Sequence, residues 1–164
     1  MDFEELVTAR GTALRRLALM LCGDPHLADD LVQNTLAKAY RRWSRIAASR
    51  QPEAYVKAMI VNEHLSWWRR RTNREVPADI EPGAAPAAPD FAGAQASRDA
   101  AWTLLGELPA RQRAVLVLRY YEDLPDAEIA RVLGCGESTV RSQAARALAT
   151  LRTLVPTLDE EARP

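Results

Sequence analysis

The sequence predicts an all-α protein that consists of two helical domains joined by a flexible, Pro/Ala-rich linker. Apolar residues recur every three or four positions in both halves of the chain, which is typical of amphipathic helices. The central stretch between them is rich in proline and glycine, which break helices. No alternating apolar and polar run is long enough to predict a strand.

The first domain is predicted over residues 1–75. Two apolar stripes at helical spacing run through it, namely Val32, Leu36, Ala39 and Trp43, and Val56, Met59, Ile60 and Trp67. The run Gly23-Asp24-Pro25 predicts the end of one helix and the start of another. Gln51-Pro52 predicts a further start, because proline is tolerated in a first helical turn.

The linker is predicted over residues 76–98, where four prolines and two glycines stand among alanines. Such a stretch has little apolar surface to bury and favours an extended, flexible segment. A second helical domain is predicted over residues 99–155, followed by a short tail, residues 156–164.

The charges are balanced overall but unevenly distributed. The chain has 22 basic and 22 acidic residues, so its net charge indicates no particular partner. Between Lys38 and Arg74, however, ten basic residues stand against only two acids, Glu53 and Glu63. A clustered basic surface is typical of nucleic-acid binding. A solvated helix face is the alternative, and charge alone does not separate the two.

Several classes of protein are excluded by what the sequence lacks. No run approaches the ~20 apolar residues of a membrane span, and the acidic start does not resemble a signal peptide. Cys22 and Cys135 make no disulfide framework, so we expect a cytoplasmic protein without membrane association. There is no nucleophile motif or phosphate loop, and Cys22 with His26 is too small a set for zinc. We expect no enzyme, cofactor or metal.

The segment "EIARVLGCGESTVRSQAARAL" predicts a helix-turn-helix. A small residue, Ala130, is followed by Gly134 at the turn and by Val140, which closes the core from the second helix. Five side chains are predicted on the outer face of that helix: Thr139, Arg141, Ser142, Gln143 and Arg146. Arg and Gln can pair with guanine and adenine edges, and Ser or Thr can contact phosphates. An ordinary helical hairpin is the alternative.

The segment "LPARQRAVLVLRYYEDLPDAEIARVLGCGESTVRSQAARALATLR" resembles region 4 of the sigma-70 family of bacterial transcription initiation factors. The segments "HLADDLVQNTLAKAYRRW" and "EAYVKAMIVNEHLSWWRRR" resemble its region 2. Because no large region 3 separates them, the chain resembles the extracytoplasmic-function group, and within it the actinobacterial SigE-like subfamily. Asp126 stands before the first helix of the helix-turn-helix, where Ser or Thr is usual in the family, and we expect it to cap that helix.

The resemblance implies a sigma factor that binds core RNA polymerase and directs it to promoter DNA. The helix-turn-helix would read the −35 element through its outer face, although Gln143 stands where the family often has Arg. The end of region 2 would capture the −10 element as a single strand. The residues expected there are Asn62, Glu63, His64, Trp67, Arg69, Arg70 and Arg71. At least one of Trp67 and Trp68 is expected to pack in the core.

The resemblance also implies protein partners. Asp29, Asp30, Gln33 and Asn34 form an acidic and amide-bearing ridge on the side of their helix away from its apolar stripe. This ridge would dock on the clamp helices of the polymerase β′ subunit, and region 4 on the β flap. From the residues alone, a solvated face is the simpler interpretation. An anti-sigma factor is a further partner consistent with the family.

Two functions of other classes remain open on the sequence. One is a free-standing helix-turn-helix regulator whose first domain dimerises or senses a signal, and which binds duplex DNA without being a polymerase subunit. The other is a protein-interaction hairpin that touches no nucleic acid. Copurification with core polymerase separates the sigma factor from both.

Overall fold

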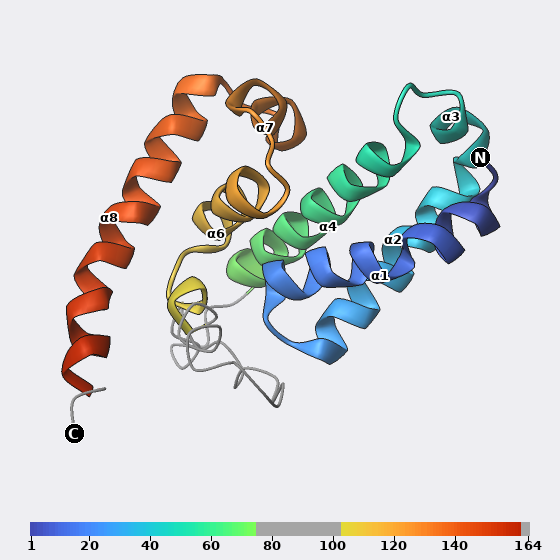
Figure 1. Ribbon diagram of the computed structural model, residues 1–164. Coiled ribbons are helices and arrows are strands. Elements are labelled where there is room, and N and C mark those ends of the chain that lie inside the picture. Colours follow the sequence, from blue (N-terminus) through green and yellow to red (C-terminus); the bar gives the residue numbers. More distant parts are fainter. Residues whose placement is uncertain (75–102, 162–164) are drawn as a thin grey trace. The chain divides into compact units, whose positions relative to one another are not determined.

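The computed structural model describes residues 1–74 and 103–161, and within these ranges it contains helices and turns but no strand. The chain divides into two compact units, Met1–Glu75 and Val76–Pro164 (Figure 1). The all-α prediction is therefore confirmed. The predicted linker, residues 76–98, lies outside the described residues. None of the described helices is both long enough and apolar enough to cross a membrane.

The first unit contains α1 (Phe3–Cys22), α2 (Pro25–Arg41), α3 (Trp43–Ala47) and α4 (Pro52–Arg74). Helix α1 begins with a capping box, in which Asp2 and Glu5 each accept a hydrogen bond from the other's backbone N–H. It ends at Gly23, whose φ of 72° closes the last turn. Asp24 then caps α2 by accepting hydrogen bonds from the backbone of His26 and Leu27. The predicted helix breaks are confirmed.

Helix α4 packs against both α1 and α2, and the core of the first unit lies between these three helices. The side chains buried most completely are Leu6, Leu14, Leu17, Ala18, Ala39, Ile46, Val56, Ile60 and Val61. The two predicted stripes contribute Val32 and Ala39 from α2, and Val56 and Ile60 from α4. Met59 and Trp67 remain half-buried, because they lie at the edges of the buried face of α4.

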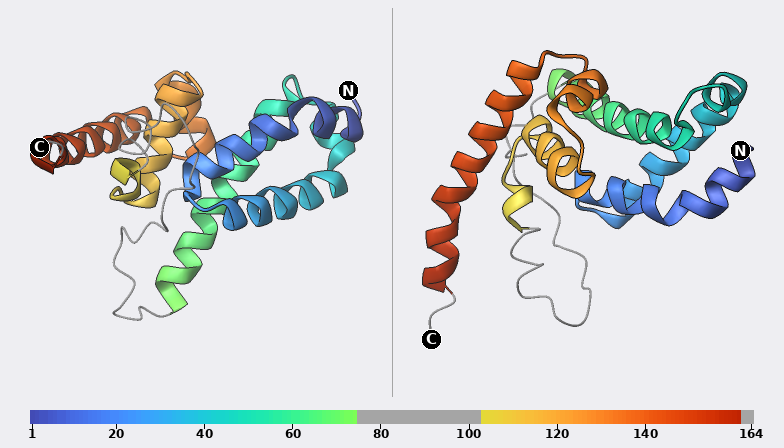
Figure 2. Two further views of the ribbon diagram at one scale, coloured as in Figure 1. Left: turned by 60° about the horizontal axis from the view of Figure 1, so that its bottom comes forward. Right: turned by 45° about the horizontal axis from the view of Figure 1, so that its top comes forward.

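The second unit contains a helical turn at residues 103–106, then α6 (Ala110–Leu116), η1 (Val117–Tyr121), α7 (Asp126–Leu133) and α8 (Glu137–Glu161). Segment η1 is a π-helix that continues directly from α6. Helix α8 contacts α6 and α7. It continues well beyond α7 as one rod in both views of Figure 2, into the segment predicted as a tail.

The helix-turn-helix is formed by α7 and α8. Gly134 adopts a left-handed conformation with φ of 67°, and its N–H donates to the carbonyl of Ala130. The N–H of Cys135 donates to the same carbonyl at 3.0 Å, so the turn satisfies the end of α7. Val140 and Ala130 are buried at the crossing, as predicted. Leu148 and Leu151, further along α8, are half-buried.

The expectation that Asp126 caps α7 is wrong. The N-cap residue is Pro125, and no side chain caps this helix. Asp126 is already the first helical residue, one position too late for its carboxylate to fold back on the free N–H groups. Instead it pairs with Arg119 of η1, whose Nη2 lies 3.4 Å from Asp126 Oδ2.

Candidate nucleic-acid interface

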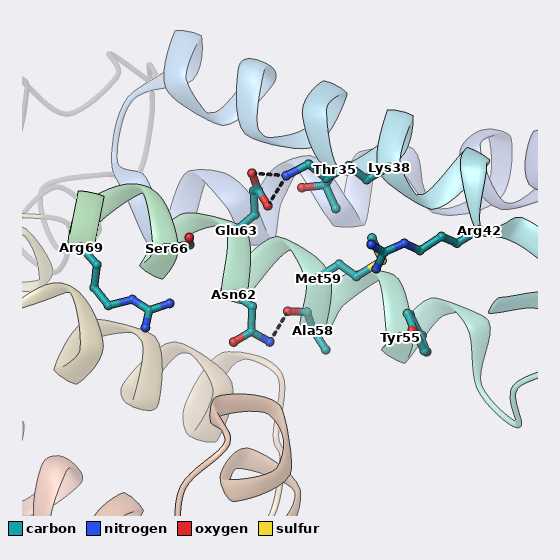
Figure 3. Close-up of a pocket in the computed structure, with 10 residues that line it drawn as sticks. All are labelled: Thr35, Lys38, Arg42, Tyr55, Ala58, Met59, Asn62, Glu63, Ser66 and Arg69. Atoms are coloured by element: carbon teal, nitrogen blue, oxygen red, sulfur yellow. Dashed lines mark hydrogen bonds and ion pairs between the residues drawn. The ribbon is translucent and has the colours of Figure 1, made fainter. Parts of the chain in front are cut away.

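An open groove of ≈ 510 Å³ runs between α2 and α4 (Figure 3). Thr35 and Lys38 line it from α2, and Arg42 lines it from the position directly after that helix. The α4 residues that line it are Tyr55, Ala58, Met59, Asn62, Glu63, Ser66 and Arg69. Among the described residues, the groove therefore combines one aromatic and two apolar side chains with two hydroxyl groups, an amide, three cations and a carboxylate, which is a composition suited to a nucleic-acid strand.

The helical repeat explains why these residues gather. Thr35, Lys38 and Arg42 stand three and four positions apart, so they follow one side of α2. Tyr55, Asn62 and Arg69 stand seven apart and follow one side of α4 in the same way. Since α2 and α4 pack together, the two rows face a common groove. Figure 3 shows Arg42 and Arg69 at opposite ends of it and Asn62 between them.

Asn62 lies on the exposed side of α4 within this groove. Its Nδ2 donates to the carbonyl oxygen of Ala58 at 3.0 Å, a hydrogen bond to its own helix that holds the side chain against α4. An amide group can donate two hydrogen bonds and accept two, so Asn62 has the chemistry to contact the edge of a base.

Glu63 is bound to α2 across the groove. Lys38 Nζ donates to both of its carboxylate oxygens, at 2.7 and 2.8 Å. Arg70 Nη2 lies 4.0 Å from the Glu63 Oε1 atom. The side chain of Glu63 is 23% exposed, whereas those of Lys38 and Arg70 are about half exposed.

The predicted −10 residues are not all on the groove side of α4. Trp67 and Trp68 are both half-buried and meet edge to face, with ring centroids 5.2 Å apart. The Arg71 guanidinium carbon lies 5.1 Å from the Trp67 ring centroid and 5.9 Å from that of Trp68. Neither tryptophan lies fully in the core, so the expectation that one would do so is wrong. Trp67 and Arg71 do not line the groove.

His64, predicted among the −10 residues, is buried in the first unit and does not line the groove. Its side chain is only 3% exposed, because it stands one turn after Ile60 on the core-facing side of α4. Its ring lies edge to face with that of Trp68, at 6.3 Å between centroids. The spacing from Ile60 is the sequence signal that could have shown this.

One residue of the acidic ridge on α2, Asp29, is paired within the protein. Arg15 Nε of α1 donates to Asp29 Oδ1 at 2.6 Å. This hydrogen bond, together with the charge of Arg15, lowers the pKa of Asp29 below its ordinary value and outweighs the opposing effect of desolvation. Asp30, Gln33 and Asn34 are exposed, as predicted.

The outer face of α8 presents three of the five predicted −35 residues to solvent. Arg141, Ser142 and Arg146 are exposed, whereas Thr139 and Gln143 are half-buried. Arg141 Nη1 lies 3.8 Å from Glu137 Oε2, an exposed pair one turn apart. Ser142 Oγ donates to the backbone of its own helix, to Ser138 and Thr139. Ala145 is also exposed.

Of the residues that line the groove, the −10 prediction includes only Asn62, Glu63 and Arg69. Lys38, Arg42 and Tyr55 are among those that it leaves out. In the sequence the two cations stand out only as part of the basic stretch. Their spacing of four along α2 places them on one side of the helix, and this was the available signal. Tyr55 carried no such signal, because its role depends on how α2 packs on α4.

The chain matches two family descriptions, one to each unit. It matches sigma-70 region 2 over residues 6–74 and sigma-70 region 4 over residues 98–151. The chain belongs to the sigma-70 family. The groove lies within the region 2 match, and the helix-turn-helix lies within the region 4 match.

Relatives place this sigma-70 protein in the extracytoplasmic-function group. It is 39% identical to the RNA polymerase sigma-E factor of Streptomyces avermitilis over 163 residues, 99% of this chain and 90% of that protein. It is 31% identical to the ECF RNA polymerase sigma factor SigL of Mycobacterium tuberculosis, over 90% of this chain and 85% of that one. The resemblance to SigE-like proteins is thereby confirmed.

A solved structure agrees with this assignment. The sigma factor RpoE of Bartonella quintana, crystallised with the anti-sigma factor NepR, matches with a TM-score of 0.71 and 28% identity. The match covers 94% of this chain and 97% of that one. The protein is thus a sigma factor that directs transcription, and the free-standing regulator is not favoured.

Proposed function

We propose that this sigma factor binds core RNA polymerase and uses its two units for the two elements of a promoter. The observation that carries the proposal is the groove between α2 and α4, which joins cations at its ends to an amide at its middle. A protein that reads only duplex DNA through α8 has no need of such a groove in its other unit. A protein that also captures a separated strand does.

The groove supplies the two kinds of contact that a separated strand requires. The guanidinium groups of Arg42 and Arg69 hold backbone phosphates at its ends, and Asn62 contacts a base edge between them. Arg70 stands beside Glu63 at the rim and contributes positive charge. We do not propose His64, Trp67 and Arg71 as DNA contacts. His64 is buried, and Trp67 and Arg71 do not line the groove.

The second unit reads the −35 element as duplex DNA. Helix α8 enters the major groove with Arg141, Ser142 and Arg146 outermost. Thr139, near the helix start, contacts a phosphate, and Gln143 reaches the DNA from the edge of the helix face. The turn at Gly134 fixes the angle at which α8 is presented.

The acidic ridge binds core polymerase. Asp30, Gln33 and Asn34 are exposed, and Asp29 adds a carboxylate that Arg15 keeps ionised. A basic helix pair such as the β′ clamp helices is the complementary partner, and the β flap is the proposed contact of the second unit. The protein itself catalyses no reaction, since RNA synthesis belongs to the polymerase. We place it in the cytoplasm, where the polymerase acts.

An anti-sigma factor is a further proposed partner. The matched RpoE structure holds NepR, an anti-sigma factor, and the fold of that protein extends over most of this chain. A protein that covered the ridge of α2 would keep this sigma factor from the polymerase.

Reconstitution with core polymerase tests the proposal. The protein and an actinobacterial core enzyme are incubated with a pool of duplexes of random sequence, and the transcripts and their templates are sequenced. The expected result is a set of start sites that share two upstream motifs, at about the −10 and −35 positions, and that require both components. Selective binding of duplex by the protein alone, with no transcripts in the presence of core enzyme, would instead support the free-standing regulator.

A further inference from the structure

Glu63, the one carboxylate among the described residues that line the groove, is an unexpected group in a surface that binds a polyanion. A carboxylate offers a phosphate no favourable contact. Two roles are conceivable for it. It could accept a hydrogen bond from a base, or it could form an ion pair with one of the cations that line the groove.

The contacts of Glu63 favour the second role. Both of its carboxylate oxygens accept hydrogen bonds from Lys38 Nζ, at 2.7 and 2.8 Å, and one of them also lies 4.0 Å from Arg70 Nη2. Lys38 thus donates to two anionic oxygens of Glu63, as it could donate to the anionic oxygens of a phosphate group. Figure 3 shows the pair bridging α2 and α4 above the groove.

We propose that Glu63 is a specificity-determining residue, which holds Lys38 as an internal substitute for a DNA phosphate and so suppresses the binding of strands that lack promoter bases. The inference rests on the proposed function of the groove as a strand-binding site. A strand must displace the carboxylate from Lys38 before it gains that phosphate contact. Contacts to the backbone alone, which every sequence offers equally, are thereby weakened relative to contacts with base edges.

The consequence is that removing the charge of Glu63 strengthens non-specific binding. In Glu63→Gln, Lys38 is released to a phosphate. We expect the affinity of the full-length protein for single-stranded oligonucleotides of random sequence to rise about twofold to fivefold, because an exposed ion pair is worth about that factor. We also expect the slope of log affinity against log salt concentration to steepen by about 0.7, which corresponds to one additional phosphate contact on single-stranded DNA.

Two further variants make the test specific. Glu53→Gln removes a carboxylate of the same helix that pairs with Arg10 and Lys57 and does not line the groove, so it should leave binding unchanged. In a Lys38→Gln background, Glu63→Gln should have no further effect, because the cation that pairs with Glu63 is gone. A general effect of net charge would persist in that background.

Fluorescence anisotropy with labelled oligonucleotides over a series of salt concentrations measures all of these variants. Unchanged or weaker random-strand binding by Glu63→Gln overturns the inference, as does an increase that survives in the Lys38→Gln background. Loss of binding confined to promoter-derived strands overturns it too, and shows that Glu63 reads a base. Arg42→Gln and Arg69→Gln are measured beside them. If neither weakens binding, the groove's proposed function fails as well; if they do, only the role of Glu63 is in question.

Discussion

Asp29 forms an ion pair within the protein before any partner binds. Arg15 donates a hydrogen bond to its carboxylate and lowers its pKa. A carboxyl group with a lowered pKa in the folded state contributes to the free energy of unfolding above its ordinary pKa, and that contribution is lost as the pH falls through the lowered value. In the pH range where the polymerase works, Asp29 is fully charged.

Replacing Arg15 by Gln should therefore raise the pKa of Asp29 toward its ordinary value, because the hydrogen bond and the positive charge that stabilise the carboxylate are both removed. The carboxyl carbon shift of Asp29, followed by NMR between neutral and acidic pH, measures this. Arg16→Gln serves as the control, since Arg16 is an exposed neighbour with no such bond to Asp29. An unchanged titration in Arg15→Gln would show that the ion pair does not form in solution.

We propose that −35 readout depends on Arg141 and Arg146. The double substitution to Ala should lower transcription from a −35-dependent promoter by roughly tenfold or more, since one bidentate base contact is worth about 1–3 kcal/mol. Binding to core polymerase should be retained. Arg152→Ala is the control, because it removes an exposed arginine further along α8. Wild-type promoter use by the double variant would place the reading surface elsewhere.

Among the elements, the turn between α7 and α8 depends most directly on a single residue, Gly134. Gly134 has φ of 67°, and no atom lies within 4 Å of an added Cβ. Gly134→Ala should thus destabilise the protein through backbone strain alone, by about 1–2 kcal/mol. Gly11→Ala, in the middle of α1 and also without a neighbouring atom, should stabilise it by about 0.5–1 kcal/mol. Urea unfolding measures both, and a shift of the same sign in both variants would contradict this interpretation.

The two sides of α4 should behave differently. Arg69 lines the groove, so Arg69→Gln should weaken the binding of single strands and reduce the salt slope by about 0.7. Arg71 stacks on Trp67 and Trp68, so Arg71→Gln should change tryptophan fluorescence and leave the salt slope nearly unaltered. Equal losses of slope in the two variants would mean that the strand contacts both sides of the helix.

These elements also show what the sequence could and could not predict. The helix boundaries follow from local chemistry, since Gly23, Pro25, Pro52 and Gly134 act on their own neighbours. The groove does not, because Lys38 and Glu63 are 25 positions apart and meet only through the packing of α2 on α4. The polar side chain of His64 predicts an exposed position, whereas its register with Ile60 places it on the core-facing side of α4.

At the scale of the whole molecule, we propose that the two units divide the work of promoter recognition. The region 2 unit carries the groove and the ridge, and the region 4 unit carries the helix-turn-helix. Their order along the chain agrees with that of the relatives, which match over 99% of this chain in the case of the Streptomyces avermitilis protein. The proposed capture of the −10 strand is what distinguishes a sigma factor from a protein that binds only closed duplex DNA.

Permanganate footprinting of the Asn62→Ala holoenzyme tests that assignment most directly. The variant is compared with wild type on a duplex promoter and on the same promoter mismatched across the −10 element, with binding to core polymerase measured alongside. We expect reduced thymine reactivity on the duplex and a smaller defect on the mismatched template, because the unpairing cost of a few kcal/mol has already been removed there. Equal melting of the duplex by the two proteins would contradict strand capture by this groove.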